Sequence, residues 1–357
     1  MKRLGNFIRD GLIIVVTTLA LLLIIEGAVR VLYPQIQSFG NSKDLFSPAR
    51  YGDSHGLTPN VSGQSIGALV VTDSNGFRID PDAPAQDNRN TTKVLFVGDS
   101  VTMPTGVVAG DGFPYLIEDN LPNVSITNSA VVGHAFGDYL SVIRNVDDSL
   151  YDGIFVGICL NDISRRSFGP EQQAQIATQD TYAPWYFRAL RKVNEVLSFN
   201  EFLRVRSRTY LLTKSLVSDR GREHFLGDKE PYEQAQTDEV LDEFFVELAK
   251  LGAEKGAPVF VAVFPYEYQL RNGQQPDVNP QERITGAANR AGLDTVDLWI
   301  EMKHMVEQQQ YVSTDYYIFG DSMHLSITGN RVVADIILNN PLFKKFLSLA
   351  EQTASTD

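Results

Sequence analysis

Three short motifs along the chain carry side chains that can perform nucleophilic chemistry. A Gly-Asp-Ser sequence ending at Ser100 follows one short apolar run, and an Asn-Asp pair beginning at Asn161 follows another. A D-x-x-H sequence near the C-terminus joins Asp321 to His324. Apolar, β-branched runs that stop at polar residues are typical of buried parallel strands, and α/β sheets bind ligands at such strand ends. Ser100 is therefore the candidate nucleophile.

Activation of Ser100 requires two partners. A serine hydroxyl attacks only when a positioned base removes its proton and a further group orients that base. On a turn, the Asp321 carboxylate accepts a hydrogen bond from one ring nitrogen of His324 and leaves the other nitrogen to face Ser100. Acyl transfer also needs donors for the oxyanion. The candidates are the backbone N–H groups of Ser100 and Gly133 and the side-chain amide of Asn161.

In order and approximate spacing, these residues resemble the signature positions of the SGNH hydrolases, also called the GDSL esterase/lipase superfamily. The four positions are Ser100, Gly133, Asn161 and His324, and the resemblance covers roughly residues 93–338. It implies a three-layer α/β/α sandwich with a central, flavodoxin-like parallel sheet. It also implies a nucleophilic serine, an oxyanion hole completed by the glycine and the asparagine, and a Ser-His-Asp triad completed by the D-x-x-H sequence.

Two positions depart from the family pattern. Cys159 stands where the G-x-N-D motif usually has its glycine, and Pro104 replaces a small residue often found shortly after the serine. Both changes alter the wall of the expected substrate pocket rather than the catalytic groups.

Apolar runs alternate with helical stretches throughout this region. Strands are expected at 94–97, 124–128, 153–158, 258–264 and 293–297, and helices at 113–120, 137–145, 238–252, 280–291 and 327–338. The alternation predicts a parallel sheet with right-handed crossovers and helices on both faces. Thr237 is the expected N-cap of the helix at 238–252, and Ser326 is the expected N-cap of the helix at 327–338. The cap at Ser326 fixes the turn that carries His324.

Residues 1–33 contain an apolar run that is long enough to cross a membrane. Such a span needs about 20 residues, and this run lacks the recurring polar face of a soluble helix. Lys2, Arg3 and Arg9 precede it, so the positive-inside rule predicts a cytoplasmic N-terminus and a catalytic domain in the periplasm or at the cell surface. A cleaved signal peptide is the alternative, but Glu26 stands where cleavage needs a small residue. An uncleaved transmembrane signal anchor is favoured.

Residues 34–91 are rich in turn formers and are expected to form an extracytoplasmic linker with a β-hairpin. Asn75-Gly76 is the hairpin signal. Arg78, which follows it, is expected either to reach the catalytic site or to form a surface salt bridge. The SGNH hydrolase domain is then expected at 92–350, followed by a C-terminal tail at 351–357.

One insertion, 164–236, interrupts the alternation of strands and helices. Its first part, from Ser164 to Ser215, carries more basic than acidic residues, interleaved with aromatic side chains. Such a segment can lie on an anionic membrane surface, form a lid over an anionic or acyl substrate, or be a helical subdomain with a solvated charged face. All three interpretations remain open from the sequence.

The composition limits the kinds of partner and cofactor that the protein is expected to bind. The net charge of −13 argues against a nucleic-acid partner. Cys159 is the only cysteine, so no intrachain disulfide forms, and its apolar run predicts a packing role. The histidines show no spacing typical of a metal site, and neither a metal nor another cofactor is expected. Asp99 and Asp162 are expected to stabilise turns, and His134 is expected to be a partly exposed loop residue without a role, with a substrate contact as the alternative.

The expected function is that of an extracytoplasmic serine esterase acting through an acyl-serine on O-acyl esters of a carbohydrate, a cell-envelope polymer or a lipid. An O-acyltransferase, such as an acetyltransferase that modifies an exported polysaccharide, is one alternative because both reactions begin with the same intermediate. The other is a non-catalytic SGNH-fold module that binds a glycan or a partner within envelope polysaccharide machinery. Retention of all three triad side chains argues against that module.

Overall fold

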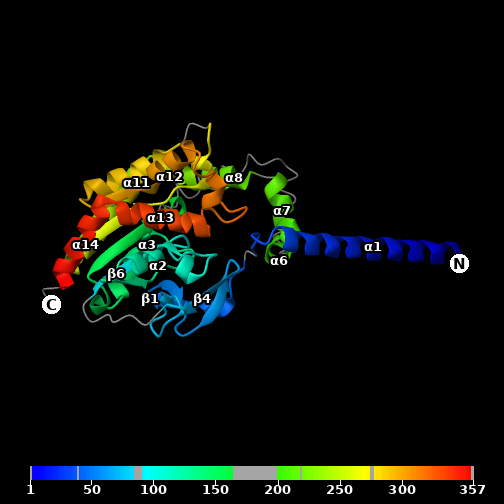
Figure 1. Ribbon diagram of the computed structural model, residues 1–357, viewed down its shortest axis with the longest axis horizontal. Helices are drawn as coiled ribbons and strands as arrows, with labels where there is room; N and C mark the ends of the chain where they lie inside the picture. Colours follow the sequence, from blue (N-terminus) through cyan, green and yellow to red (C-terminus); the bar gives the residue numbers. More distant parts are fainter. Residues whose placement is uncertain are drawn as a thin grey trace.

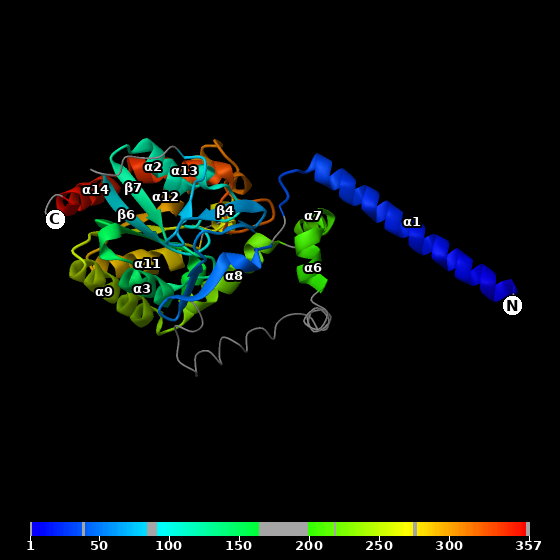
Figure 2. The same ribbon diagram turned by 90° about the horizontal axis from the view of Figure 1, so that it is seen from below.

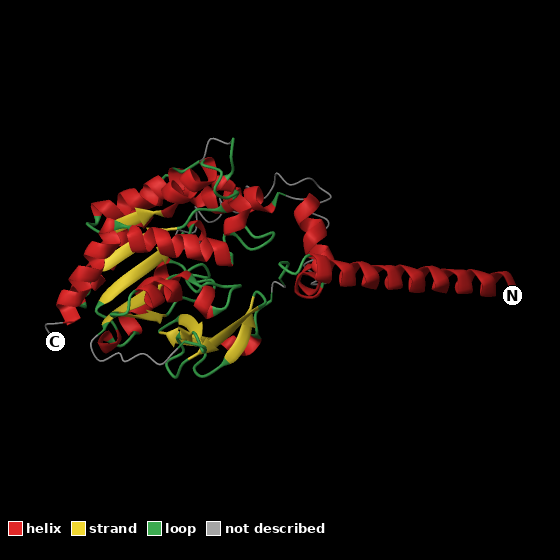
Figure 3. Ribbon diagram, in the orientation of Figure 1, coloured by secondary structure: helices red, strands yellow, loops and turns green. Residues whose placement is uncertain are grey.

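A single mixed sheet forms the centre of the protein (Figures 1 and 3). The computed structural model describes residues 2–37, 40–83, 91–163, 199–217, 219–273 and 277–354. The eight strands lie in the order β10-β9-β8-β6-β7-β5-β4-β3. The parallel strands are β6 (Thr92–Val97), β7 (Val124–Asn128), β8 (Gly153–Ile158), β9 (Val259–Val263) and β10 (Asp294–Asp297). Their carboxyl ends therefore meet at one edge of the sheet.

Helices cover both faces of the sheet (Figure 2). One layer contains α2 (Phe113–Asn120), α12 (Leu298–Glu307), α13 (Ile327–Asn339) and α14 (Pro341–Ala354). The other contains α3 (Phe136–Asn145), α9 (Thr237–Glu254) and α11 (Asn279–Arg290). The predicted three-layer α/β/α fold class is confirmed. The sheet is mixed rather than wholly parallel because antiparallel strands extend one side of it.

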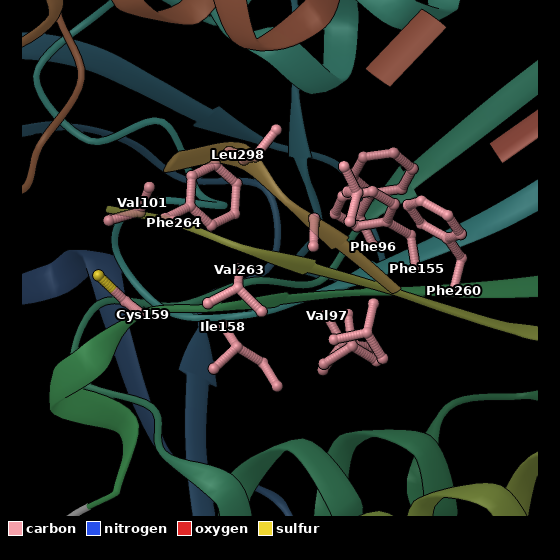
Figure 4. Packing of buried hydrophobic residues seen from close by; sticks show 14 of the residues in the cluster. Phe96, Val97, Val101, Phe155, Ile158, Cys159, Phe260, Val263, Phe264 and Leu298 are labelled. Atoms are coloured by element: carbon pink, nitrogen blue, oxygen red, sulfur yellow. The ribbon is translucent and has the colours of Figure 1, made fainter. Parts of the chain in front are cut away.

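The central strands are buried on both faces, which explains their nearly continuous apolar sequences. All six residues of β8 are buried. On one face Phe96 and Phe155 stack with ring centroids 4.2 Å apart. Val97, Ile158 and Val263 point to the other face, as Figure 4 shows. Burying each of these side chains stabilises the fold by about 1.5–3 kcal/mol, so the strand ends that carry the motifs are rigidly placed.

The segment expected as a linker forms a separate two-stranded sheet, from its first two strands, and adds its other three strands to the central sheet. It forms β1 (Phe46–Tyr51), β2 (Ser54–Leu57), β3 (Ser62–Ser65), β4 (Ala68–Thr72) and β5 (Arg78–Ile79). The expected hairpin turn at Asn75-Gly76 joins β4 to β5, and the Asp73 carboxylate accepts hydrogen bonds from the Asn75 and Phe77 backbone N–H groups. Arg78 then pairs with Asn128 of β7. The hairpin is thus continuous with the sheet that carries the motifs.

One of the two predicted helix caps is correct. The Ser326 side chain accepts a hydrogen bond from the Gly329 N–H and caps α13, as expected. The predicted cap at Thr237 is wrong: Gln236 precedes α9, and the Thr237 hydroxyl instead donates to the carbonyls of Pro231 and Gln234. A buried threonine surrounded by preceding carbonyls donates to them rather than accepting from the helix.

The N-terminal helix α1 (Lys2–Leu32) projects away from the rest of the protein (Figure 1). Its segment Arg9–Leu32 is long and apolar enough to cross a membrane, although a signal sequence shares these properties. The end of α1 packs on α7 (Arg208–Val217), where Val29 and Leu211 are buried together. The Glu26 carboxylate accepts hydrogen bonds from the Arg208 and Thr209 backbone N–H groups.

Two further helices belong to the expected insertion. They are α6 (Phe199–Arg206), which precedes α7, and α8 (Arg220–Lys229), which follows it. Residues 164–198 of the insertion and residues 84–90 of the expected linker lie outside the described residues.

Candidate active site

The loops after the parallel strands bring the predicted triad residues together. Ser100 follows β6, and the D-x-x-H sequence lies in the loop before α13. The Ser100 Oγ lies 2.8 Å from Nε2 of His324, and Nδ1 of His324 lies 2.8 Å from Oδ2 of Asp321. These contacts join residues that are 224 positions apart in sequence. This hydrogen-bonded line has the geometry required for a nucleophile, its base and the group that orients the base.

The Asp321 carboxylate is fixed by its own loop. Its Oδ1 accepts hydrogen bonds from the backbone N–H groups of Met323 and His324, at 2.9 and 3.0 Å. Burial raises the pKa of the Asp321 carboxyl, but the charge of His324 and these hydrogen bonds outweigh burial, so the pKa lies well below its ordinary value. Asp321 is therefore ionised at neutral pH.

The same pair sets the ionisation of the base. Burial lowers the pKa of His324, but the charge of Asp321 and the hydrogen bond to its carboxylate outweigh burial and raise the pKa above 6.5. A carboxylate on Nδ1 also selects the tautomer that leaves Nε2 to accept a proton from Ser100.

Two backbone N–H groups in the site have no acceptor among the residues that the structure describes. They belong to Ser100, which is only 5% exposed, and to Gly133, which is exposed in the loop after β7. Gly133 has a φ of 80°, a left-handed conformation that favours glycine. N–H groups without an acceptor are able to donate to an oxyanion, so the role predicted for Ser100 and Gly133 is compatible with the structure and stays a prediction.

The Asn161 amide, the third predicted oxyanion donor, is held by two neighbours. Its Oδ1 lies 3.4 Å from the Tyr266 hydroxyl, which donates a second, shorter hydrogen bond of 2.7 Å to Asp228. The Asn161 side chain also hydrogen-bonds to Asp99. With Oδ1 next to Tyr266, the amide nitrogen is the donor to Asp99, and the oxyanion role of Asn161 stays a prediction. Sequence reasoning missed Tyr266, because no motif marks the end of β9.

The two aspartates beside the catalytic motifs stabilise turns, as expected. Asp99 Oδ1 accepts from the Val101 N–H at 2.8 Å, and Asp162 Oδ2 accepts from the Cys159 N–H at 2.7 Å. Burial raises the pKa of both carboxyls. Cys159 is buried in the core, in agreement with the predicted packing role, and burial raises the pKa of its thiol.

Close packing around Thr102 fixes the turn that carries the nucleophile. A Cβ added at Gly98 or at Gly157 would collide with the Thr102 side chain. These two glycines lie on neighbouring strand ends, and their missing side chains let the Ser100 turn pack directly against β8.

Arg78 performs neither of the two roles expected for it. It is 1% exposed and donates hydrogen bonds to the carbonyls of Met103, Pro104 and Val107. Both the substrate contact and the surface salt bridge are therefore wrong: Arg78 holds the loop that follows Ser100. Burial lowers its pKa.

His134 is also buried, rather than partly exposed as predicted. Its ring lies 4.7 Å from that of His55, and its Nε2 lies 2.8 Å from the His55 carbonyl oxygen. Burial lowers the pKa of His134 to about 4, so the ring is neutral at pH 7. Strand β2, which carries His55, covers it.

A cavity of about 200 Å³ lies directly beside the triad. Its lining consists of Asn41, Ile66, Arg204, Arg220, His224, Asp321, Met323 and His324. A larger cleft of about 1070 Å³ shares Arg220 and Asp321 with it and extends to Gln35 and Gln37, next to the end of α1. In the part of the chain that the structure describes, no group of His, Cys, Asp and Glu residues is arranged to hold a metal ion.

No protein-family model and no curated protein matches the chain. Solved structures that align with it include a member of the lipolytic G-D-S-L family from Veillonella parvula. That alignment has 13% identity and a TM-score of 0.37, and it covers 69% of this chain and 95% of that chain. The acetyl xylan esterase AlAXEase aligns at 16% identity with a TM-score of 0.40, and the alignment covers 68% of this chain and 96% of that chain. The acetylxylan esterase Axe2 from Geobacillus stearothermophilus aligns at 14% identity with a TM-score of 0.39, and the alignment covers 72% of this chain and 96% of that chain. At these values the likeness assigns neither activity nor substrate to this chain.

Proposed function

We propose that this chain is a membrane-anchored serine esterase that acts on O-acyl esters through an acyl-serine intermediate. The proposal rests on one observation, the hydrogen-bonded line from Asp321 through His324 to Ser100. A non-catalytic binding module has no need of a proton relay, so this geometry favours an enzyme.

In the proposed reaction, Ser100 Oγ attacks the ester carbonyl carbon while His324 Nε2 takes the hydroxyl proton. The Asp321 carboxylate stabilises the imidazolium that forms. The N–H groups of Ser100 and Gly133 and the Asn161 amide donate to the developing oxyanion. Collapse of the tetrahedral intermediate breaks the ester C–O bond, and His324 gives its proton to the leaving alkoxide. Water, deprotonated by His324, then attacks the acyl-serine and releases the carboxylic acid and the free serine.

Transfer of the acyl group to a sugar hydroxyl is the second candidate reaction. The cleft of about 1070 Å³ that adjoins the triad offers space for an acceptor beside the acyl-serine. Product analysis with a panel of short-chain esters, with and without an oligosaccharide acceptor, separates the two. Free acid in both conditions supports the esterase, whereas acylated acceptor formed at the expense of free acid supports the transferase.

We expect kcat/KM to rise with pH and to level off above the pKa of His324. The neutral ring is the active form because only an unprotonated Nε2 accepts the serine proton. Since the pKa of His324 is raised above 6.5, the inflection should lie above that value. A pH profile measured on a neutral ester tests this. A profile that is flat between pH 5 and 9 would contradict the assignment of His324 as the base.

Asn161→Ala should lower kcat by about 10²- to 10³-fold with little change in KM, because an oxyanion donor acts mainly in the transition state. Steady-state kinetics on one ester measures both constants. Asn279→Ala is the control, because it removes the same side-chain amide from α11, away from the site. A loss confined to KM would instead make Asn161 a substrate-binding residue.

We also propose that α1 remains as an uncleaved anchor, with the N-terminus in the cytoplasm and the catalytic domain outside the membrane. The basic residues before the apolar segment support this orientation. The contacts of Glu26 with the start of α7 support retention, because cleavage after the apolar segment would remove them. The intact mass of the protein extracted from membranes tests the proposal. A mass that lacks the N-terminal residues would contradict it.

A further inference from the structure

Two arginines and a histidine line one wall of the cavity beside the triad, here called the basic wall. Arg204 comes from α6, and Arg220 and His224 come from α8. Arg220 and His224 are four residues apart on one helix, so they share a face. The one carboxylate in the lining, that of Asp321, is hydrogen-bonded to His324. The basic wall therefore stands next to a carboxylate that is already engaged within the triad.

Hydrogen bonds hold two of these side chains against the catalytic loop. Arg220 Nη1 donates to the Gly320 carbonyl oxygen at 2.9 Å. His224 Nδ1 lies 2.8 Å from the hydroxyl of Ser322, a residue with no exposed surface. Both contacts are made to residues between or beside the members of the D-x-x-H sequence. Arg220 and His224 are thus held directly against the loop that carries Asp321 and His324.

Three of the four charged side chains that act on the pKa of His224 are positive. Burial lowers the pKa of His224, and the charges of Arg220, Arg204 and Lys214 lower it further, although Asp321 acts in the opposite direction. This local group of positive charges contrasts with the whole chain, whose net charge is −13. An anionic group that enters the cavity is therefore attracted to this position rather than to the protein as a whole.

The adjoining cleft differs in its electrostatics. Two of its carboxylates, those of Asp219 and Glu267, are paired with Arg271 at 2.7 Å. The two spaces meet at Arg220 and Asp321, which line both. At about 200 Å³ the smaller cavity is below the usual range for a whole ligand and suits one substituent.

We propose that this cavity binds an anionic group, a carboxylate or a phosphate, that the substrate carries close to its ester, with the remainder of the substrate in the larger cleft. The proposal deepens the proposed function and rests on it. Guanidinium groups bind carboxylates and phosphates through paired, charge-assisted hydrogen bonds, so Arg204 and Arg220 are the specificity-determining residues. The preferred esters are thus acylated acidic sugars or acylated phospholipid headgroups rather than neutral esters.

Two matched pairs of esters test the proposal with the full-length protein in detergent micelles. The first pair is an O-acetylated methyl galacturonoside and the corresponding galactoside, which differ only in the carboxylate. The second is a lysophosphatidic acid and a monoacylglycerol with the same acyl chain, which differ only in the phosphate. We expect kcat/KM for the charged member of one pair to exceed that of the neutral member about ten- to one-hundred-fold. The pair that shows this preference identifies the source of the anion.

Substitutions on the two helices assign the preference to the cavity. Arg204→Gln and Arg220→Gln should each reduce the charged-to-neutral ratio of kcat/KM at least several-fold, mainly by raising KM for the charged ester. Arg206→Gln on α6 and Arg222→Gln on α8 are matched controls, because both side chains are exposed and lie outside the cavity lining. These controls should keep the wild-type ratio.

Equal kcat/KM values within both pairs would overturn the inference and leave the esterase proposal intact. A ratio that Arg204→Gln does not change would also overturn it. If none of the esters is cleaved and a fluorophosphonate does not label Ser100, the proposed function fails instead. In that case calorimetry with galacturonate and galactose on the same protein still tests the cavity: selective binding of galacturonate, weakened in Arg204→Gln, supports an anion site, and equal or absent binding overturns it.

Discussion

Replacing Ser100 with alanine is expected to lower kcat for ester cleavage by about 10⁴- to 10⁶-fold, because the variant has no oxygen to form the acyl-serine. The Ser100 hydroxyl is mostly buried and lies 2.8 Å from Nε2 of His324. Its removal leaves only the donors of the oxyanion site to assist direct attack by water. Steady-state kinetics on the ester that wild type cleaves best provides the measurement.

Ser129→Ala is the matched control for this variant. Ser129 is buried in the loop after β7, and its hydroxyl donates to the Phe96 carbonyl oxygen rather than to the triad. The control should lose about 1 kcal/mol of stability and retain most of its activity. A Ser100→Ala variant that keeps more than a tenth of wild-type kcat would show that another residue is the nucleophile.

Replacing Asp321 with asparagine is expected to lower kcat by about 10⁴-fold while the protein still folds. The asparagine carbonyl can still accept hydrogen bonds from the Met323 and His324 backbone N–H groups, so the loop keeps its shape. Its amide, however, stabilises neither the required tautomer of His324 nor the imidazolium. The pKa of His324 should fall because the charge that raises it has been removed.

Two readouts therefore separate a catalytic role of Asp321 from a structural one. The thermal unfolding temperature should change little, whereas the inflection of the pH–rate profile should move to lower pH. Asp242→Asn, in α9 and paired with Arg290 away from the site, is a control that should change neither the rate nor the inflection. Near-normal turnover in Asp321→Asn would reject the assignment of this carboxylate to the triad.

The strands and helices of the catalytic domain were predictable because burial on both faces leaves a clear signal in the sequence. Strands β7 and β8 and helix α2 begin and end where expected, and the other expected elements agree to within two residues. The meeting of Ser100 with the D-x-x-H sequence was expected from the resemblance to the SGNH hydrolases rather than from strand geometry, because the D-x-x-H sequence lies in the loop before α13 and not at a strand end. Three helices of the domain were missed, α10 (Glu267–Leu270), α12 and α14, because no strand follows any of them directly to complete the alternation.

The rest of the site depends on tertiary contacts that leave little signal in the sequence. Arg78 lies on a two-residue strand, and its burial follows from the pairing of β5 with β7 and from the carbonyls of the next loop. Tyr266 orients Asn161 from the end of a different strand. Arg220 and His224 face the triad only because α8 packs against the catalytic loop. In each case the position is determined by a partner that is distant in sequence.

The most direct test of the central claim is the reaction of the full-length protein with a fluorophosphonate, followed by mapping of the modified residue by mass spectrometry. A nucleophilic serine activated by His324 should form one phosphonyl adduct on Ser100, more rapidly at pH 8 than at pH 6, and His324→Ala should suppress it. An intact, folded protein that forms no adduct, or forms it on another residue, would contradict the account.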